Sequence, residues 1–417
     1  MAEEKVFGMK PESGRWAYVL LGLLMNLCLG AVYAFSVFRK PLQAPAVDGG
    51  WGLTVTQSGL PFMVFLAVFA LFMALAGGLV GKWGPKKSGI LGGALVGAGW
   101  ILAGFASNIT WLTLFYGVIG GAGVGIIYGC PIAVSAKWFP DHKGLAVGLT
   151  VMGFGLSALL MAPLMRALID HPSVGPLRTF TYLGIAFLAL LVLLSLPMRT
   201  PAEGWKPCGW AGLAARGSSG VDLDRPQMLR TGSFYALWGT YTIGCLAGLM
   251  AIGISSPVGE EVALLTPSIA AFSVSLFAVF NGIGRPIFGW LTDRLTPRYA
   301  AALSFVLILF AAALLYLWGE GNPAVYFVAF IVLWMNLGGW LAVAPTATAT
   351  LFGTRHYAKN YGLVFTSYGV GALLGNTLAG MIRDASGGYL PVFLPVIGLA
   401  AAGLVVSLVW LKPLKAS

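Results

Sequence analysis

One arginine within an apolar stretch is the residue of this sequence whose type and position most clearly imply chemistry. Arg285 follows Asn281 by one helical turn, so both side chains project from one face of a helix. Gly282, Gly284 and Pro286 lie beside them and leave space around the arginine. A guanidinium is planar, stays charged and binds a carboxylate through two parallel hydrogen bonds. The pattern therefore predicts the binding of an organic anion.

Arg285 has no acidic partner within its own apolar stretch. All 14 carboxylates and all 3 histidines of the chain fall in polar loops or at the ends of apolar stretches. A charge at membrane depth costs about 2.5–3.5 kcal/mol on insertion scales, so something must compensate it. A substrate carboxylate would do so. In the alternative, the side chain reaches the membrane surface along about five residues, roughly 8 Å of helix.

Tyrosines within apolar stretches are the next candidates, because a phenol hydroxyl orients a carboxylate while its ring lines an apolar pocket. The candidates are Tyr33, Tyr116, Tyr128, Tyr241 and Tyr368. Such tyrosines are more often packing residues, and position alone does not separate the five. The apolar stretches contain no paired carboxylates, histidine cluster or nucleophile with its base, so we expect no catalytic site, no metal and no cofactor.

The elements that must position these residues are membrane helices. The chain of 417 residues is 58% apolar and only 9% charged, whereas a soluble domain is about 25% charged. Spanning a membrane takes about 20 apolar residues. Twelve stretches qualify, at roughly 16–38, 60–81, 89–106, 111–136, 145–165, 179–197, 233–256, 268–290, 299–317, 324–350, 361–382 and 390–411. The predicted fold class is an all-α membrane protein with twelve transmembrane helices.

A polar segment divides these stretches six and six. Residues 198–232 contain the Pro, Gly, Ser and charged residues of a linker, so residues 1–197 and 233–417 are the predicted halves. The halves also repeat, because Gly77–Lys87 after the second stretch corresponds to Gly289–Arg298 after the eighth. Two parallel halves place a substrate site near the membrane midplane, between them.

Basic residues in the loops predict the orientation. Nineteen of the 25 Lys and Arg residues lie in the N-terminus, the even-numbered connections and the C-terminus, five lie on the other side, and Arg285 is the last. Because basic loops stay in the cytoplasm, both termini are predicted there, in a multi-pass protein of the bacterial inner membrane. The basic residues are scattered singly, so no nucleic acid partner is expected. We expect a monomer whose partners are lipid, a small anion and a proton.

Four segments resemble a known family. They are GAGVGIIYG with KWFPDHKGLA within 121–146, MLRTGSFYALW (228–238), FNGIGRPIFGWLTDR (280–294) and NYG (360–362). They resemble the bacterial oxalate/formate antiporters and the related monocarboxylate transporters, over essentially all twelve spans. The run from Gly289 to Arg294 also resembles the loop signature of the major facilitator superfamily, with Gly81 in place of its acid in the first half. The resemblance implies the major facilitator fold.

The resemblance also implies site residues and a substrate class. It places the family's essential arginine on Arg285, a first-span tyrosine on Tyr33 and the Tyr-Gly of the fourth span on Tyr128. Oxalate antiporters carry a lysine where this chain has Tyr368, and an aromatic cage where it has leucines at 337 and 341. One cation in a more apolar pocket suits a monoanion such as lactate or pyruvate, because a second carboxylate would stay unpaired in a desolvated site.

The animal monocarboxylate carriers have an aspartate at the position of Asn281 and a first-span lysine without a counterpart here, both implicated in proton coupling. The function expected is proton-coupled symport of small monocarboxylates by alternating access. The expected substrate-binding residues are Arg285, Asn281, Tyr33, Tyr128 and Tyr368. Two alternatives stay open, namely carboxylate antiport of the oxalate/formate type and a non-transporting carboxylate sensor.

Overall fold

Helices make up nearly all of the computed structural model, which describes residues 6–45, 47, 50–53, 55–202, 204–208 and 221–412. The described helices, in chain order, are α1 (Pro11–Leu29), η1 (Gly30–Ala34), α2 (Ser36–Gln43), α3 (Val55–Ala103), α4 (Ile109–Leu112), η3 (Thr113–Gly120), α5 (Gly121–Trp138), α6 (Lys143–Ile169), α7 (Gly175–Ser195), α8 (Arg225–Leu229), α9 (Gly232–Glu261), α10 (Pro267–Leu295), α11 (Pro297–Trp318), α12 (Pro323–Phe352), α13 (Tyr357–Val364), α14 (Thr366–Ser386), η4 (Leu390–Val392) and α15 (Phe393–Trp410).

Among the described residues, 10 helical segments are long and apolar enough to cross a membrane. α3 alone contains the second and third predicted spans, and it turns at Gly84, whose φ of 76° favours glycine. The predicted span 361–382 is divided between α13 and α14 and is not among the 10. The predicted span 16–38 was wrong at both ends, since the helix begins at Pro11, a residue favoured in a first turn, and its last turn ends at Ala34.

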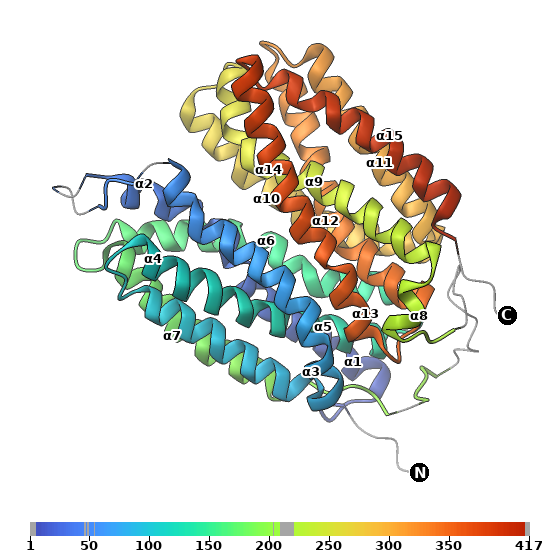
Figure 1. Ribbon diagram of the computed structural model, residues 1–417. Coiled ribbons are helices and arrows are strands. Elements are labelled where there is room, and N and C mark those ends of the chain that lie inside the picture. The colour runs from blue at the N-terminus through green and yellow to red at the C-terminus, as the bar shows by residue number, and fades with distance from the viewer. Residues whose placement is uncertain are drawn as a thin grey trace.

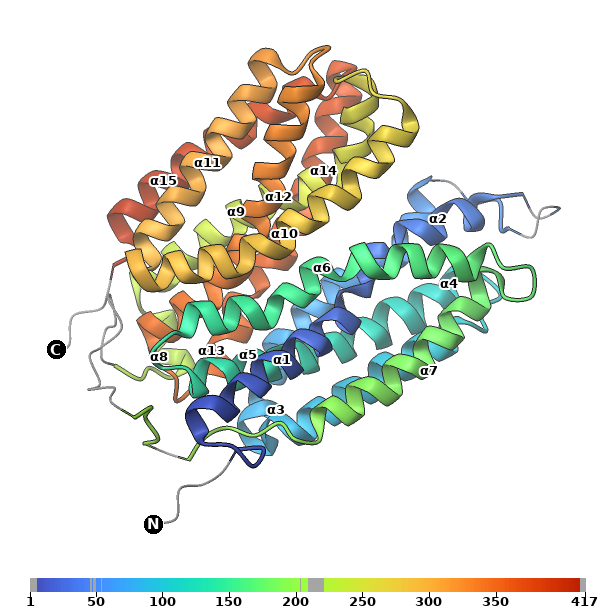
Figure 2. The same ribbon diagram turned by 180° about the vertical axis from the view of Figure 1, so that it is seen from behind.

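The helices form two groups that lie side by side (Figure 1). We call α1–α7 the first helix group and α9–α15 the second helix group. α6 and α10 run along each other between the groups, as the view from behind also shows (Figure 2). The division of the chain at residues 198–232 stays a prediction, and residues 203 and 209–220 of that segment lie outside the described residues.

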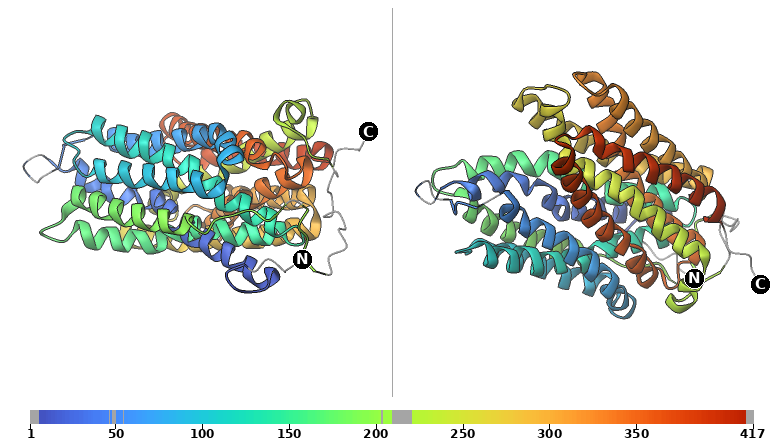
Figure 3. Two further views of the ribbon diagram at one scale, coloured as in Figure 1. Left: turned by 90° about the horizontal axis from the view of Figure 1, so that it is seen from below. Right: turned by 45° about the horizontal axis from the view of Figure 1, so that its top comes forward.

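α1 begins and α15 ends at the same end of the bundle, which we call the terminal end (Figure 3). α6 also begins there, and α10 ends there. The two helix groups meet at the terminal end, where α13 packs against α3 and α5. The ribbons of the two helix groups lie further apart at the opposite end, where α2 lies (Figure 1).

Glycines set the distance between α6 and α10. A Cβ atom added to Gly148 would lie 2.6 Å from the carbonyl oxygen of Arg285, and one added to Gly155 would lie 2.7 Å from the Cα of Gly282. Membrane helices approach this closely only where small residues face each other. These glycines therefore bring the backbone around Arg285 into direct contact with the first helix group.

Candidate anion-binding site

Arg285 is fully buried and bonded to the opposite helix group. Its Nη1 donates to the carbonyl oxygen of Val151 on α6 at 2.6 Å, and its Nη2 donates to Oδ1 of Asn281 at 3.2 Å. Its Nε has no hydrogen-bond partner among the described atoms. The side chain is 0% exposed and bonds inward to Val151 and Asn281, so it does not reach out to solvent.

Asn281 holds this arrangement in place. Its Nδ2 donates to the carbonyl oxygen of Trp334 on α12 at 3.0 Å, which leaves Oδ1 to accept from Arg285. Both partners of the guanidinium are neutral, and no described carboxylate forms an ion pair with it. The structure thus presents a buried cation whose charge is solvated by two dipoles and whose remaining donors are available to an anion.

Two tyrosines from opposite helix groups meet beside this cation. The hydroxyl oxygens of Tyr33, on η1, and Tyr368, on α14, lie 2.7 Å apart. The guanidinium of Arg285 interacts electrostatically with the hydroxyls of Tyr33 and Tyr128. Tyr128 and Tyr368 are buried, and Tyr33 is half-buried. The structure therefore brings all five residues that the sequence singled out into one neighbourhood, although their binding roles stay predictions.

Three phenylalanines complete the site, and none of them is among the predicted substrate-binding residues. The ring of Phe154 on α6 lies edge-on to Tyr33, with centroids 5.0 Å apart, and its centroid is 5.6 Å from the guanidinium carbon of Arg285. Phe365 stacks on Tyr368 at 5.0 Å, and Phe69 contacts both phenylalanines. These rings exclude water from the cation, which strengthens its attraction for an anion.

The sequence held only weak signals for these rings. Phe154 lies between Gly153 and Gly155, in a segment that repeats in the second half, and Phe365 precedes Tyr368 by less than one turn. Phe69 carries no such signal. All three come from helices far apart in the chain, so only the tertiary structure reveals that they meet.

Of the two other candidate tyrosines, Tyr116 lies away from the site, and Tyr241 lies beside it, with its ring centroid 6.4 Å from that of Phe365. Tyr116 is surrounded by Phe35, Phe65, Trp100 and Phe180 in the first helix group. Tyr241 stacks on Trp340 with centroids 6.0 Å apart. Leu337 and Leu341, at the positions of the expected aromatic cage, are both buried in the core.

The acid of the Gly289–Arg294 segment closes the terminal end in a way that the sequence did not indicate. The carboxylate of Asp293 accepts hydrogen bonds from the backbone N–H groups of Gly144 at 2.9 Å and Leu145 at 3.0 Å. These groups begin α6, so the carboxylate caps the N-terminus of a helix in the opposite group and favours its positive dipole end. The contact is with the backbone of α6.

Comparisons with known proteins agree with this architecture. The family model described as "Major Facilitator Superfamily" matches residues 27–261 and 231–417. The chain is 28% identical over 377 residues to the oxalate:formate antiporter of Oxalobacter formigenes, covering 89% of this chain and 86% of that one. It is 29% identical over 421 residues to monocarboxylate transporter 13 of Bos taurus, covering 96% and 91%.

Solved structures show a similar fold. The Escherichia coli fucose:proton symporter FucP superposes with a TM-score of 0.69 at 16% sequence identity, over 94% of this chain and 97% of that one. A bacterial homologue of the human lysosomal transporter Spinster superposes with a TM-score of 0.59 at 18% identity, over 95% and 94%. At these identities the likeness shows the fold alone.

Proposed function

This chain belongs to the Major Facilitator Superfamily, and on that premise we propose that it carries small monocarboxylates, such as L-lactate and pyruvate, together with a proton. The chain is a multi-pass membrane transporter, and its relatives are transporters and not enzymes. Alternating access of the two helix groups around Arg285 would move the substrate. The proposed location is the bacterial inner membrane, with both termini in the cytoplasm and the protein a monomer.

The observation that carries the proposal is the buried guanidinium of Arg285 without a described carboxylate partner. Taking a cation out of water costs several kcal/mol, roughly, unless a counter-charge compensates it. A substrate carboxylate supplies that counter-charge through two parallel hydrogen bonds. The surrounding aromatic rings suit a small organic tail.

The substrate carboxylate would compete with the carbonyl oxygen of Val151 for Nη1 of Arg285. Because this bond joins the two helix groups, its replacement by a substrate bond would loosen their contact at the site. Neutralising the arginine would also lower the barrier to reorientation. One proton carried with each monoanion would make the transport electroneutral.

A monocarboxylate fits better than a dicarboxylate for a geometric reason. At the position where oxalate antiporters are expected to carry a second cation, this chain has Tyr368, whose hydroxyl is bonded to that of Tyr33. A second carboxylate would thus be desolvated without a cationic partner, which is strongly unfavourable.

Anion exchange is the second candidate, because the chain is similar over most of its length to an oxalate:formate antiporter. The two modes differ in what drives uptake. A symporter accumulates its substrate when a pH gradient is the only driving force, whereas an obligatory exchanger needs an anion inside.

The test is uptake of labelled L-lactate, pyruvate and oxalate into proteoliposomes that contain no internal anion substrate, with and without an inward proton gradient. We expect lactate and pyruvate to accumulate only with the gradient, and oxalate not to accumulate. Uptake that requires internal oxalate or formate would instead assign exchange. Binding of lactate without any flux would assign a sensor and overturn the proposal.

A further inference from the structure

A cavity at the terminal end is lined by positive charge. It measures about 360 Å³ and lies between the two helix groups. Its lining includes the side chains Lys82, Lys137, Arg355, His356 and Lys359, and no Asp or Glu that the structure describes lines it. Four of these groups carry a full charge at neutral pH. Lys82, Arg355 and Lys359 are exposed and Lys137 is half-buried, and their combined positive potential attracts anions to the cavity.

The internal repeat explains why an acid is missing here. In the second helix group Asp293 caps the N-terminus of α6. The repeat puts Gly81 in its place in the first helix group, where it lines the cavity beside α13. An added Cβ at Gly81 would meet only the Cε of Lys359, at 4.0 Å. The space that a carboxylate fills on one side is therefore open on the other.

The helix that faces this space has no side-chain cap of its own. α13 begins after His356, whose side chain makes no capping hydrogen bond. The carboxylate of Asp222 accepts from the backbone N–H of Arg355 at 3.0 Å, directly before this start, and Asp222 does not line the cavity. This carboxylate opposes the positive dipole end of α13, so the basic side chains are the source of the positive charge in the cavity.

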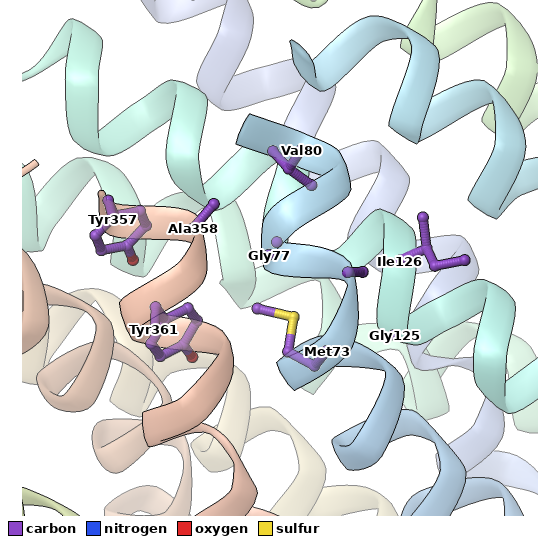
Figure 4. Close-up of a pocket in the computed structure, with 10 residues that line it drawn as sticks. Met73, Gly77, Val80, Gly125, Ile126, Tyr357, Ala358 and Tyr361 are labelled. Atoms are coloured by element: carbon purple, nitrogen blue, oxygen red, sulfur yellow. The ribbon is translucent and has the colours of Figure 1, made fainter. Parts of the chain in front are cut away.

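A buried hydroxyl also lacks a partner at this place. Tyr357 lines the cavity and the small apolar pocket next to it, of about 10 Å³, where α13 faces α3 (Figure 4). Its side chain is 1% exposed, and its hydroxyl has no hydrogen-bond partner among the described atoms. This hydroxyl interacts electrostatically with that of Tyr128, which lies beside Arg285, so it faces the interior and not the basic side chains of the cavity.

We infer that this cavity is a second anion site, separate from the site at Arg285, which binds an oxyanion between α3, α5 and α13. The ligand class is a small carboxylate or a phosphate group, and the phosphate comes either from solution or from a lipid headgroup. A ligand held by both helix groups would stabilise the arrangement in which they meet at the terminal end. The inference does not depend on which substrate Arg285 binds.

Thiol reactivity measures the potential in the cavity without any transport. Thr354, another lining residue, is changed to cysteine in a full-length chain whose native cysteines at 28, 130, 208 and 245 are replaced by serine. The readout is the ratio of the rate constants for an anionic and a cationic methanethiosulfonate reagent. A basic cavity speeds the anionic reagent and slows the cationic one.

Two charge-removing pairs provide the comparison. We expect Lys137→Gln with Lys359→Gln to lower that ratio at least about threefold, because both side chains line the cavity together with the thiol. The matched pair Lys86→Gln with Lys87→Gln removes the same charge from exposed positions near the cavity and should change the ratio little. Equal effects of the two pairs would overturn the inference.

Gly81→Asp restores the missing acid and tests the same idea in the other direction. The space at Gly81 admits the side chain, so this variant should lower the ratio as the Lys137 and Lys359 changes do. In this variant, added anions should no longer slow the reaction of the Thr354→Cys thiol. A ratio unchanged in Gly81→Asp would contradict the assignment of this cavity.

Lipid composition separates the two sources of the anion. In phosphatidylcholine nanodiscs, protection of the Thr354→Cys thiol by inorganic phosphate or L-lactate assigns a soluble anion. Protection that appears only when phosphatidylglycerol is added assigns a lipid headgroup. No protection by any of the three would rule out an anion site.

Discussion

Nη1 of Arg285 donates a 2.6 Å hydrogen bond to the carbonyl oxygen of Val151, so the buried cation of one helix group is held by the backbone of the other. A neutral carbonyl orients the guanidinium but leaves its charge uncompensated. An arriving carboxylate is a stronger acceptor than this carbonyl. In the proposed function, substrate binding and the contact between the helix groups are linked through this one side chain.

Arg285→Lys keeps the charge but removes the planar pair of donors. We expect the dissociation constant for L-lactate to rise at least about tenfold, because a lysine ammonium cannot bind a carboxylate in two places while also reaching Val151. Binding to the purified protein measures this. Arg166→Lys is the control, since that arginine pairs with Asp170 at an exposed position. Unchanged affinity in Arg285→Lys would remove the arginine from the site.

Tyr33 and Tyr368 should act as one unit. Their hydroxyls share a hydrogen bond of 2.7 Å, which is worth about 0.5–1.5 kcal/mol. We expect Tyr33→Phe and Tyr368→Phe each to weaken lactate binding roughly two- to tenfold. The double variant should lose no more lactate affinity than the single variant with the larger loss. The first change already breaks the shared hydrogen bond, so the second has no bond left to remove.

Tyr116→Phe is the matched control for this cycle. Its hydroxyl is buried in the first helix group and has no hydrogen-bond partner among the described atoms. Its removal should leave lactate binding unchanged. Fully additive losses in the Tyr33 and Tyr368 double variant would show that the two hydroxyls act independently.

Gly148→Ala should disturb the contact between the helix groups. The added methyl would lie 2.6 Å from the carbonyl oxygen of Arg285 and 2.8 Å from the Cα of Pro286. Both are backbone atoms, so α6 and α10 must separate, at a cost of about 1–3 kcal/mol. We expect populations to shift away from the state that is closed at the terminal end, and transport to slow.

Spin labels at Ser173→Cys and Ser386→Cys, in a chain without native cysteines, report the distance between the groups at the opposite end. Gly148→Ala should shift this distance to shorter values as that end closes. Gly398→Ala is the control, because a Cβ there meets no atom within 4 Å. The same distance distribution in both variants would contradict the prediction.

Asp141 connects α1 to the loop after α5, and its contribution should depend on pH. Arg15 donates to its two oxygens at 2.6 and 2.7 Å. Burial raises the pKa of Asp141, but the hydrogen bonds and charge of Arg15 outweigh it and hold that pKa below its usual value of 3.8. The stabilisation is therefore complete above the unfolded-state pKa and is lost as the pH falls through the folded-state pKa.

Asp141→Asn should lower the free energy of unfolding at neutral pH by about 1.5–3 kcal/mol. The difference from the parent protein should stay constant between about pH 5.5 and 8 and vanish in acid. Unfolding in detergent at a series of pH values measures it. Asp170→Asn removes an exposed partner of Arg166 and should cost less than about 1 kcal/mol. A larger loss of unfolding free energy in Asp170→Asn than in Asp141→Asn would contradict the stabilising role assigned to Asp141.

The sequence by itself determined the fold class and the central residue. Composition and the lengths of the apolar stretches require membrane helices, because lipid leaves backbone groups no other partner. The lone charge at Arg285, beside Asn281, predicted an anion site, because an embedded charge demands compensation wherever the chain folds around it. The boundaries of single helices, such as the start at Pro11, were less certain because end residues tolerate either environment.

The tertiary structure alone decided what surrounds the arginine. Val151, Phe69 and Phe154 have ordinary apolar side chains, and nothing in their local sequence marks them as neighbours of a cation. The bond between Asp293 and the start of α6 is likewise made to backbone, which every residue carries. Contacts of this kind depend on how two helices cross, and that crossing is set by glycines distant in the chain.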